Sequence, residues 1–216
     1  MKQSTTFLKL VDAFSRLNGV GPRTAERMAY NIISMNKDDA EYFAHAILET
    51  KQKIHQCPKC GLYTDDELCE ICKDESRDHS TMIIISHPKD VYIFEKTLKI
   101  SPIYHVLGEN IDFSKGFKPT SLSIGSLLNR IKENEVKEII IATDPTQEGE
   151  VTALYLKKIL EPTGVTISRL AYGLTLGTSI DYTDSLTLEK AIEGRRKLWV
   201  YLLHLKAEKV QVKQLF

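Results

Sequence analysis

Four cysteines arranged in two close pairs constrain the fold of this chain more than any other feature. Cys57 and Cys60 form the first pair, Cys69 and Cys72 form the second, and eight residues separate the pairs. Each pair can place two thiolates on one ion, and four thiolates complete a tetrahedral site with no open coordination position. We therefore expect a structural zinc ion that folds a segment of about 20 residues, because so short a segment has no core of its own. A redox dithiol or a disulfide is the alternative, but a redox motif needs only one pair.

The composition of the whole chain is that of a globular protein. Apolar residues make up 42% and charged residues 27%, which excludes a disordered or collagen-like chain. No apolar run approaches the roughly 20 residues of a membrane helix, and the first six residues contain no apolar signal core. We therefore expect a reducing, cytoplasmic environment, in which the cysteines stay available as thiols or metal ligands.

Charge is balanced over the whole chain but is unevenly distributed. The 29 basic and 29 acidic side chains cancel, which excludes a globally basic nucleic-acid binder. Residues 1–30 and 195–216 are nonetheless basic, whereas acidic residues gather in 65–78, around the second cysteine pair. These patches indicate either surfaces for an anion and for a protein partner, or solvated charged faces with no ligand.

Hydrophobic spacing in the first 54 residues predicts three helices. Apolar side chains fall at helical spacing in residues 5–17 and again in residues 38–54. Between these segments, Pro22 suits the first turn of a helix that runs to about Ser34. The expected inner face of this middle helix consists of Ala25, Met28, Ala29, Ile32 and Ile33.

The turn between the first two predicted helices contains Gly19 and Gly21. Glycine permits unusual backbone angles and removes the Cβ atoms that would block a phosphate group. Free N–H groups at the start of the next helix favour an anion, and Arg23 and Arg27, four residues apart, project from one face of that helix. We interpret the turn as a site that grips the DNA backbone without reading its sequence. A tight turn with no ligand is the alternative.

From Thr81 onward, strand patterns alternate with helix patterns. Continuous apolar runs predict strands at residues 82–85, 104–107, 138–142 and 165–170. Helical spacing predicts helices near residues 89–98, 124–131 and 148–160. Apolar strands separated by helices indicate an α/β domain whose parallel sheet is buried on both faces.

Three acidic residues follow the third predicted strand. Asp144, Glu148 and Glu150 lie at its carboxyl end, where open α/β sheets bind ligands. They could hold Mg²⁺ as in phosphoryl-transfer sites. However, a further acid is missing at Thr146, and no acid directly follows the first strand. We therefore expect no bound Mg²⁺ and favour helix capping or contact with a partner for these acids.

The order of these modules resembles the RecR family of recombination mediators. The resemblance covers residues 7–198, and the tail from Trp199 to Phe216 extends beyond the expected end of the family. Its motifs are the glycine turn with its two arginines, the four cysteines, Pro88–Val91, Tyr104–Gly108, Ala142–Glu150 and Glu193–Arg196.

The resemblance implies a multi-module α/β chain and assigns roles to individual residues. A helix-hairpin-helix would occupy residues 1–54, a four-cysteine zinc finger 55–78, a Toprim domain 79–175 and a C-terminal segment with a basic tail 176–216. The family's DNA-contacting arginines fall on Arg23 and Arg27, and its zinc ligands fall on the four cysteines. Its partner-binding acids fall on Glu148 and Glu150, with Asp144 beside them.

The resemblance also implies a function. Family members form ring-like homotetramers in the bacterial cytoplasm, at the nucleoid, that encircle gapped, single-stranded or double-stranded DNA. They act with RecO, and often RecF, to help load RecA onto DNA coated by single-strand-binding protein, and they have no catalytic residues. Two other hypotheses remain: a Mg²⁺-dependent Toprim enzyme, such as a nuclease or topoisomerase, that uses Asp144 and Glu148, and a zinc-dependent adaptor that binds only protein.

Overall fold

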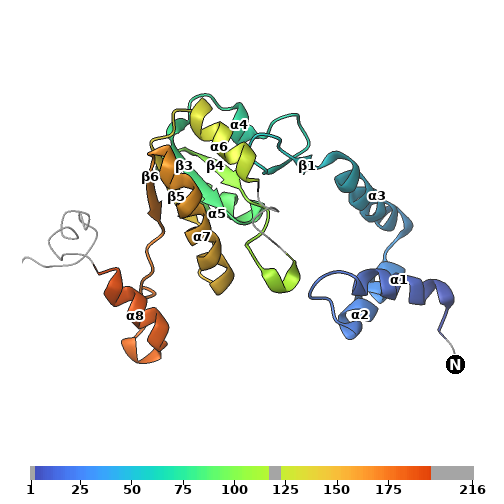
Figure 1. The fold of residues 1–216 in the computed structure, drawn as a ribbon. Helices are drawn as coiled ribbons and strands as arrows, with labels where there is room; N and C mark the ends of the chain where they lie inside the picture. The colour runs from blue at the N-terminus through green and yellow to red at the C-terminus, as the bar shows by residue number, and fades with distance from the viewer. Residues whose placement is uncertain (1–2, 117–122, 196–216) are drawn as a thin grey trace, which may run out of the picture. The chain divides into compact units, whose positions relative to one another are not determined.

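The computed structural model describes residues 3–116 and 123–195, without the side chain of Phe113. The described residues fall into two compact units, divided between Glu75 and Ser76 (Figure 1). The predicted basic tail, residues 199–216, lies outside the described residues. Helices alone precede the cysteine segment, and a parallel sheet with helices follows it, so the predicted multi-module α/β class is confirmed.

The N-terminal helices form where the sequence predicts them. They are α1 (Thr5–Ser15), α2 (Pro22–Ser34) and α3 (Lys37–Lys53). Pro22 occupies the first turn of α2, where a backbone N–H would have no intrahelical acceptor, so the lack of this group costs no hydrogen bond. Helices α1 and α2 bury Phe7 against Ala25 and Ala29, and the ring of Phe7 lies 4.6 Å from that of Tyr30.

The apolar faces of this region are less buried than the sequence suggests. Ile33, expected on the inner face of α2, is 61% exposed. Helix α3 is 17 residues long and buries none of them within the described part of the chain. Tyr42, Ile47 and Leu48 of α3 are each more than half exposed. An exposed apolar surface of this kind is typical of an interface with another chain.

The cysteine segment contains three short elements. Strands β1 (His55–Gln56) and β2 (Tyr63–Thr64) pair antiparallel, and the one-turn helix α4 (Glu70–Lys73) follows them. The first cysteine pair lies in the hairpin between β1 and β2, and the second pair lies at α4. Leu62 and Ile71 are the apolar side chains buried beside the cysteines.

A four-stranded parallel sheet forms the second unit. Its strands β3 (Asp78–Ile85), β4 (Pro102–Val106), β5 (Glu138–Ala142) and β6 (Thr166–Arg169) lie in the order β4-β3-β5-β6. Helices α6 (Ile124–Glu133) and α7 (Gln147–Leu160) cover one face, and α5 (Pro88–Thr97) covers the other (Figure 1). Met82, Ile84, Ile139 and Leu156 are fully buried between the sheet and the first two helices. The predicted parallel sheet is therefore confirmed.

The order of the strands creates a switch point between β3 and β5. The chain leaves β3 toward β4 on one side and reaches β5 on the other side. Loops therefore diverge at the carboxyl ends of β3 and β5, which leaves a crevice suited to a ligand or partner. The acidic residues expected to be functional follow β5, at this crevice.

Short elements complete the second unit. Among the described residues, 3-10 turns are formed by Phe113–Lys115, Glu161–Thr163 and Ile180–Tyr182, and helix α8 spans Ser185–Glu193. Asp184 caps α8 by accepting hydrogen bonds from the backbone N–H and the hydroxyl of Thr187. No helix among the described residues is long and apolar enough to cross a membrane.

Candidate functional sites

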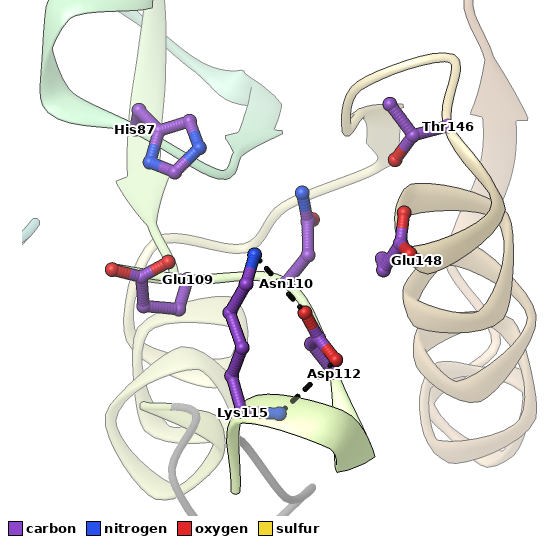
Figure 2. A pocket seen from close by; sticks show the side chains of 7 residues that line it. All are labelled: His87, Glu109, Asn110, Asp112, Lys115, Thr146 and Glu148. Carbon is purple, nitrogen blue, oxygen red and sulfur yellow. Dashed lines mark hydrogen bonds and ion pairs between the residues drawn. The ribbon is translucent and has the colours of Figure 1, made fainter. Parts of the chain in front are cut away.

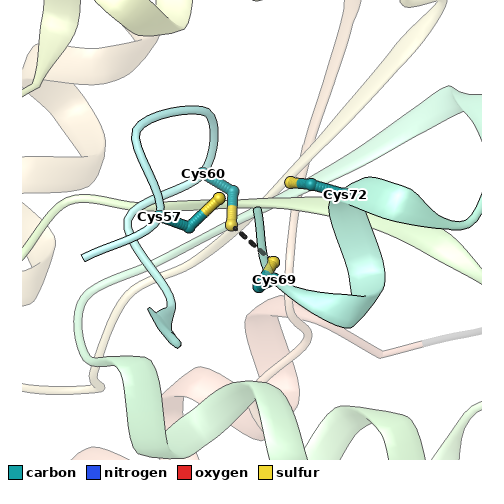
Figure 3. Close-up of side chains that lie close together, drawn as sticks. All are labelled: Cys57, Cys60, Cys69 and Cys72. Atoms are coloured by element: carbon teal, nitrogen blue, oxygen red, sulfur yellow. Dashed lines mark hydrogen bonds between the residues drawn. The ribbon is translucent and has the colours of Figure 1, made fainter. Parts of the chain in front are cut away.

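The four cysteines form one cluster. Their sulfur atoms all lie within 4.8 Å of one another, and Cys57, Cys60 and Cys69 are at most 2% exposed (Figure 3). A turn closed by the Gly61 N–H on the Cys57 carbonyl, at 2.8 Å, holds the first pair. Gly61 has a φ of 81°, a conformation that favours glycine, directly after the first pair. The spacing seen in the sequence therefore brings all four thiols together.

The cluster fits a tetrahedral metal ion with sulfur ligands. Zinc–sulfur bonds of about 2.3 Å place the sulfurs of a regular tetrahedron about 3.8 Å apart. The Cys60 and Cys69 sulfurs lie 3.4 Å apart, close to that spacing. Hydrogen bonds with the thiols of Cys60 and Cys72 lower the pKa of Cys69, and the interaction with Cys69 raises the pKa of Cys60. A metal ion must displace these shared protons, so its affinity falls as the pH falls.

The turn before α2 is built around one glycine rather than two. Gly19 has a φ of 80°, which other residues rarely adopt, and the N–H of Val20 closes the turn on the carbonyl of Leu17 at 3.1 Å. Gly21 has a φ of −77°, which any residue can adopt, so of the two glycines Gly19 alone uses the conformational freedom of glycine. Gly21 instead precedes α2 with open space where its Cβ would be, and no side chain caps the helix.

The two predicted DNA-contacting arginines are free to bind a ligand. Arg23 and Arg27 lie one turn apart on α2, and both are exposed. Within residues 3–116 and 123–195, neither guanidinium has a hydrogen bond or ion pair. By contrast, Arg16 in the preceding helix is paired with Asp12 at 2.7 Å. The start of α2 therefore combines unsatisfied N–H groups with two unpaired positive charges, an arrangement suited to phosphate.

Asp144 is held by neighbours at the switch point. Its carboxylate accepts a hydrogen bond from the Asn110 side chain at 3.0 Å and lies 3.5 Å from the His87 ring. Asn110 in turn accepts a hydrogen bond from Ser86 at 2.6 Å. Ser86 and His87, the residues that follow β3, therefore help to fix Asp144 in place.

An open pocket lies beside Asp144 and is lined mainly by charged and polar side chains. It has a volume of about 190 Å³, and Glu148 points into it (Figure 2). Its one lysine, Lys115, is paired with Asp112 at 3.2 Å, so the remaining acids give the pocket a negative charge. The lining residues are His87, Glu109, Asn110, Asp112, Lys115, Thr146 and Glu148.

Thr146 explains how α7 begins. Its hydroxyl oxygen accepts a hydrogen bond from the N–H of Gly149 at 3.1 Å, which caps the helix. The position that lacks an acid thus has a structural role. Glu148 and Glu150 lie in the first turn of α7, where the helix dipole favours negative charge.

Glu150 does not line the pocket and makes a different set of contacts. Its carboxylate accepts hydrogen bonds from Arg169, at 2.5 Å, and from the hydroxyl of Tyr172. Partial burial alone would raise the pKa of Glu150, but the Tyr172 hydrogen bond and the Arg169 charge outweigh it and lower that pKa. The three predicted acids therefore have different surroundings. Asp144 is bound by Asn110, Glu148 faces the pocket, and Glu150 pairs with Arg169. Among the described residues, the cysteines are the one group of three or more metal-binding side chains close enough to share an ion.

Sequence reasoning missed Asn110, Arg169 and Tyr172, the partners of these acids. Asn110 follows β4 and Arg169 ends β6, so each lies at the carboxyl end of a strand. This position was a usable signal, because carboxyl ends of parallel strands meet at one edge. Tyr172 lies in an irregular segment and gave no signal.

Family models match successive parts of the chain. The helix-hairpin-helix model of RecR matches residues 7–51, and the four-cysteine zinc finger domain model of RecR matches residues 54–74. A Toprim domain model matches residues 80–171, and the C-terminal model of RecR matches residues 174–196. The zinc-finger match contains all four cysteines, so the cluster is a structural zinc site.

Whole proteins match along nearly their full length. The Recombination protein RecR of Enterococcus faecalis is 43% identical over 190 residues, which are 88% of this chain and 96% of that protein. The protein of the same name from Lacticaseibacillus casei is 46% identical over 191 residues, again 88% and 96%. That of Lactiplantibacillus plantarum is 42% identical over 199 residues, 92% of this chain and all of that protein.

Proposed function

The chain belongs to the RecR family of recombination proteins, which act in recombinational DNA repair, and on this premise we propose that it is a DNA clamp without catalytic activity. The proposed clamp is a ring-like homotetramer that binds gapped, single-stranded or double-stranded DNA without sequence preference. With RecO, and RecF, it helps to load RecA onto DNA coated by single-strand-binding protein. Its modules are those expected from the sequence, with boundaries near residues 54, 78 and 175.

The observation that carries the proposal is the unpaired arginine pair at the start of α2. Arg23 and Arg27 are exposed and lack ion-pair partners in the described part of the chain. The adjacent turn leaves the helix N-terminus open, so a phosphate can meet both the N–H groups and the guanidinium groups. Contacts of this kind bind the DNA backbone and carry no sequence information.

The proposal is tested with zinc-loaded protein and a labelled gapped duplex in the presence of Mg²⁺. We expect binding that weakens steeply with salt, because each neutralised phosphate releases counterions. The double variant R23A/R27A should bind much more weakly, with a shallower salt dependence. The matched control is K157A/K158A, which removes two exposed charges from α7.

Recovery of the DNA on a denaturing gel separates the alternatives. Intact DNA after R23A/R27A-sensitive binding supports the clamp. Nicked DNA that depends on Asp144 would instead identify a Toprim enzyme. Failure of the wild-type chain to bind any DNA would favour the protein-only adaptor, for which the acidic residues 65–78 provide a surface.

The absence of catalysis is proposed from the contacts of the acids. Asn110 binds Oδ2 of Asp144, Arg169 binds Oε1 of Glu150, and among the described residues the three acids do not form a group that could share one ion. We propose the acidic face formed by Asp144, Glu148 and Glu150 as the surface for RecO. Substitutions here should weaken RecO binding more than DNA binding.

The homotetramer is supported by the N-terminal unit. Helix α3 buries no residue within the described chain, although Tyr42, Ile47 and Leu48 are large and apolar. Exposed apolar surface of this size is costly in water and is usually covered by another subunit. Light scattering should therefore give a mass well above 24.5 kDa, and I47E/L48E should lower it.

A further inference from the structure

Four side chains form one hydrogen-bonded cluster at the end of the sheet, next to the proposed RecO surface. Arg169 lies at its centre and donates to Glu150 at 2.5 Å and to the Thr143 hydroxyl at 2.8 Å. It also donates to the Tyr172 hydroxyl through Nε, at 2.9 Å, and Tyr172 donates to Glu150. The Thr143 hydroxyl donates to the Gly149 carbonyl at 2.9 Å. The cluster therefore joins the end of β5, the first turn of α7 and the end of β6.

The cluster also holds the segment that leads to the C-terminal helix. Tyr172 lies three residues after β6, in a segment that leads through the 3-10 turn Ile180–Tyr182 to α8. The end of α8 approaches the same point, because a Cβ on Gly194 would lie 3.6 Å from the Tyr172 carbonyl. Lys190 of α8 is close enough for its charge to act on Glu150. Glu150 thus links α7 of the Toprim domain to residues 170–194 through Tyr172.

Glu148 has none of these contacts, although it lies in the same helical turn. Its side chain is exposed, and no hydrogen bond or ion pair engages its carboxylate within the described residues. It points into the pocket, which Asn110 also lines (Figure 2). The two acids are therefore chemically alike but differ in their contacts within the described residues. Glu148 has no partner there, whereas Glu150 is bound by the guanidinium of Arg169 and the hydroxyl of Tyr172.

We propose that Glu150 is a positioning residue that holds residues 170–194 against the Toprim domain, and that, of the two α7 acids on the proposed RecO surface, Glu148 makes the direct contact with the partner. A basic group on the partner can pair with Glu148 without competition, whereas at Glu150 it would compete with the positive charge of Arg169, which already pairs with that carboxylate. The role of Glu148 rests on the proposed function. The role of Glu150 does not, because its contacts lie within the chain.

The first experiment measures amide hydrogen exchange of the full zinc-loaded chain. The variants are E150Q, Y172F and, as the matched control, E148Q. Y172F is informative because it removes one hydroxyl and leaves both carboxylates in place. We expect E150Q and Y172F to speed exchange in peptides covering residues 166–194 by about tenfold, the effect of losing a hydrogen bond to a charged group. E148Q should leave this exchange unchanged, as should all three variants in peptides from α2.

The second experiment measures the affinity of the same variants for RecO. E148Q should weaken RecO binding with normal exchange, and E150Q and Y172F should weaken it to similar extents. Weaker binding by E150Q with normal binding by Y172F would overturn the proposal, because Glu150 would then contact RecO directly. Unchanged exchange in both E150Q and Y172F would also overturn it. If wild-type chain does not bind RecO, the proposed function fails, while the exchange data still decide the role of Glu150.

Discussion

At the scale of single residues, Gly149 shows how closely the segment after β5 is packed. A Cβ on Gly149 would lie 1.9 Å from the backbone oxygen of Asp144, a distance that no real contact allows. The segment from Asp144 to Gly149 can close on itself only because this side chain is absent. The position of Asp144, and of the acids that follow it, therefore depends on one glycine.

Substitution of Gly149 tests this dependence. We expect G149A to destabilise the Toprim domain by about 3 kcal/mol, because a backbone carbonyl must shift to make room. The control is G125A in α6, where a Cβ meets no atom and helix propensity should add about 0.5–1 kcal/mol. Urea unfolding measures both. Equal stability of G149A and wild-type protein would contradict the packing described here.

His105 gives the Toprim domain a pH dependence. It is 1% exposed, and burial together with the neighbouring Arg130 charge lowers its pKa to about 3. The unfolded chain binds this proton near pH 6.5, whereas the folded chain stays neutral, so His105 stabilises the fold above pH 6.5 and this contribution is lost as the pH falls toward 3.

The free energy of unfolding should fall by about 2 kcal/mol between pH 7 and pH 5, because His105 binds one proton in the unfolded chain and none in the folded chain. Urea unfolding at both pH values measures it. H105Q should lose this part of the pH dependence, whereas H79Q, at a partly buried histidine, should keep it. An H105Q variant with the same pH slope as wild-type protein would show that other groups are responsible.

At the scale of elements, the zinc segment and the sheet edge are stabilised in different ways. The segment of β1, β2 and α4 buries few apolar side chains besides its cysteines, so the metal must supply most of its stability. Strand β4, at the edge of the sheet, is instead covered by side chains from its own domain, and all five of its residues are buried.

Zinc removal should therefore unfold the segment of β1, β2 and α4 and leave the parallel sheet folded. We expect chelation, or acidification that protonates the thiols, to expose residues 55–75 to protease while β3–β6 remain resistant. Limited proteolysis with mass spectrometry locates the cuts, and restored resistance after zinc is added back is the control. Protease resistance of residues 55–75 in metal-free protein would refute a structural role for the ion.

Along the free edge of β4, side chains donate hydrogen bonds to the backbone carbonyl oxygens. Arg77 donates to the Pro102 carbonyl at 3.0 Å, and Arg130 donates to the Tyr104 carbonyl at 2.6 Å. Ser123 donates to the Val106 carbonyl at 3.2 Å. These three oxygens alternate along the strand and point away from β3. A foreign strand therefore cannot use them to extend the sheet.

Arg77 is the most informative of these residues to replace. We expect R77M to cost about 2 kcal/mol and to cause self-association, because it frees the Pro102 carbonyl and removes the positive charge that pairs with Glu95. Urea unfolding and light scattering measure the two effects, and K89M on the exposed side of α5 is the control. A monodisperse R77M variant of normal stability would show that the edge needs no such protection.

The elements were largely predictable, and the contacts between them were not. Apolar runs identified β5 without error, and cysteine spacing identified the zinc centre, because both signals are local. Strands β1 and β2 are two residues long and show no periodicity. The pairing of Glu150 with Arg169 depends on β5 and β6 being neighbours, which no local pattern reveals. Ile33 was assigned to a core because helical spacing defines a face but not what covers it.

At the scale of the whole molecule, we expect an assembly rather than a single chain. The N-terminal unit exposes apolar side chains of α3. This helix directly follows α2, which carries Arg23 and Arg27, in the chain. One chain offers few contacts to DNA, and each is weakened by salt. A closed ring would hold DNA by topology, so it would need no strong individual contact.

Retention on circular DNA tests the closed ring most directly. Protein is loaded onto a gapped circular plasmid, washed at high salt, and compared with the same complex after one restriction cut. We predict that wild-type protein stays on the circle and is lost when the cut creates ends. Equal loss from circular and linear DNA would contradict a closed clamp, and would leave ordinary salt-sensitive binding through Arg23 and Arg27.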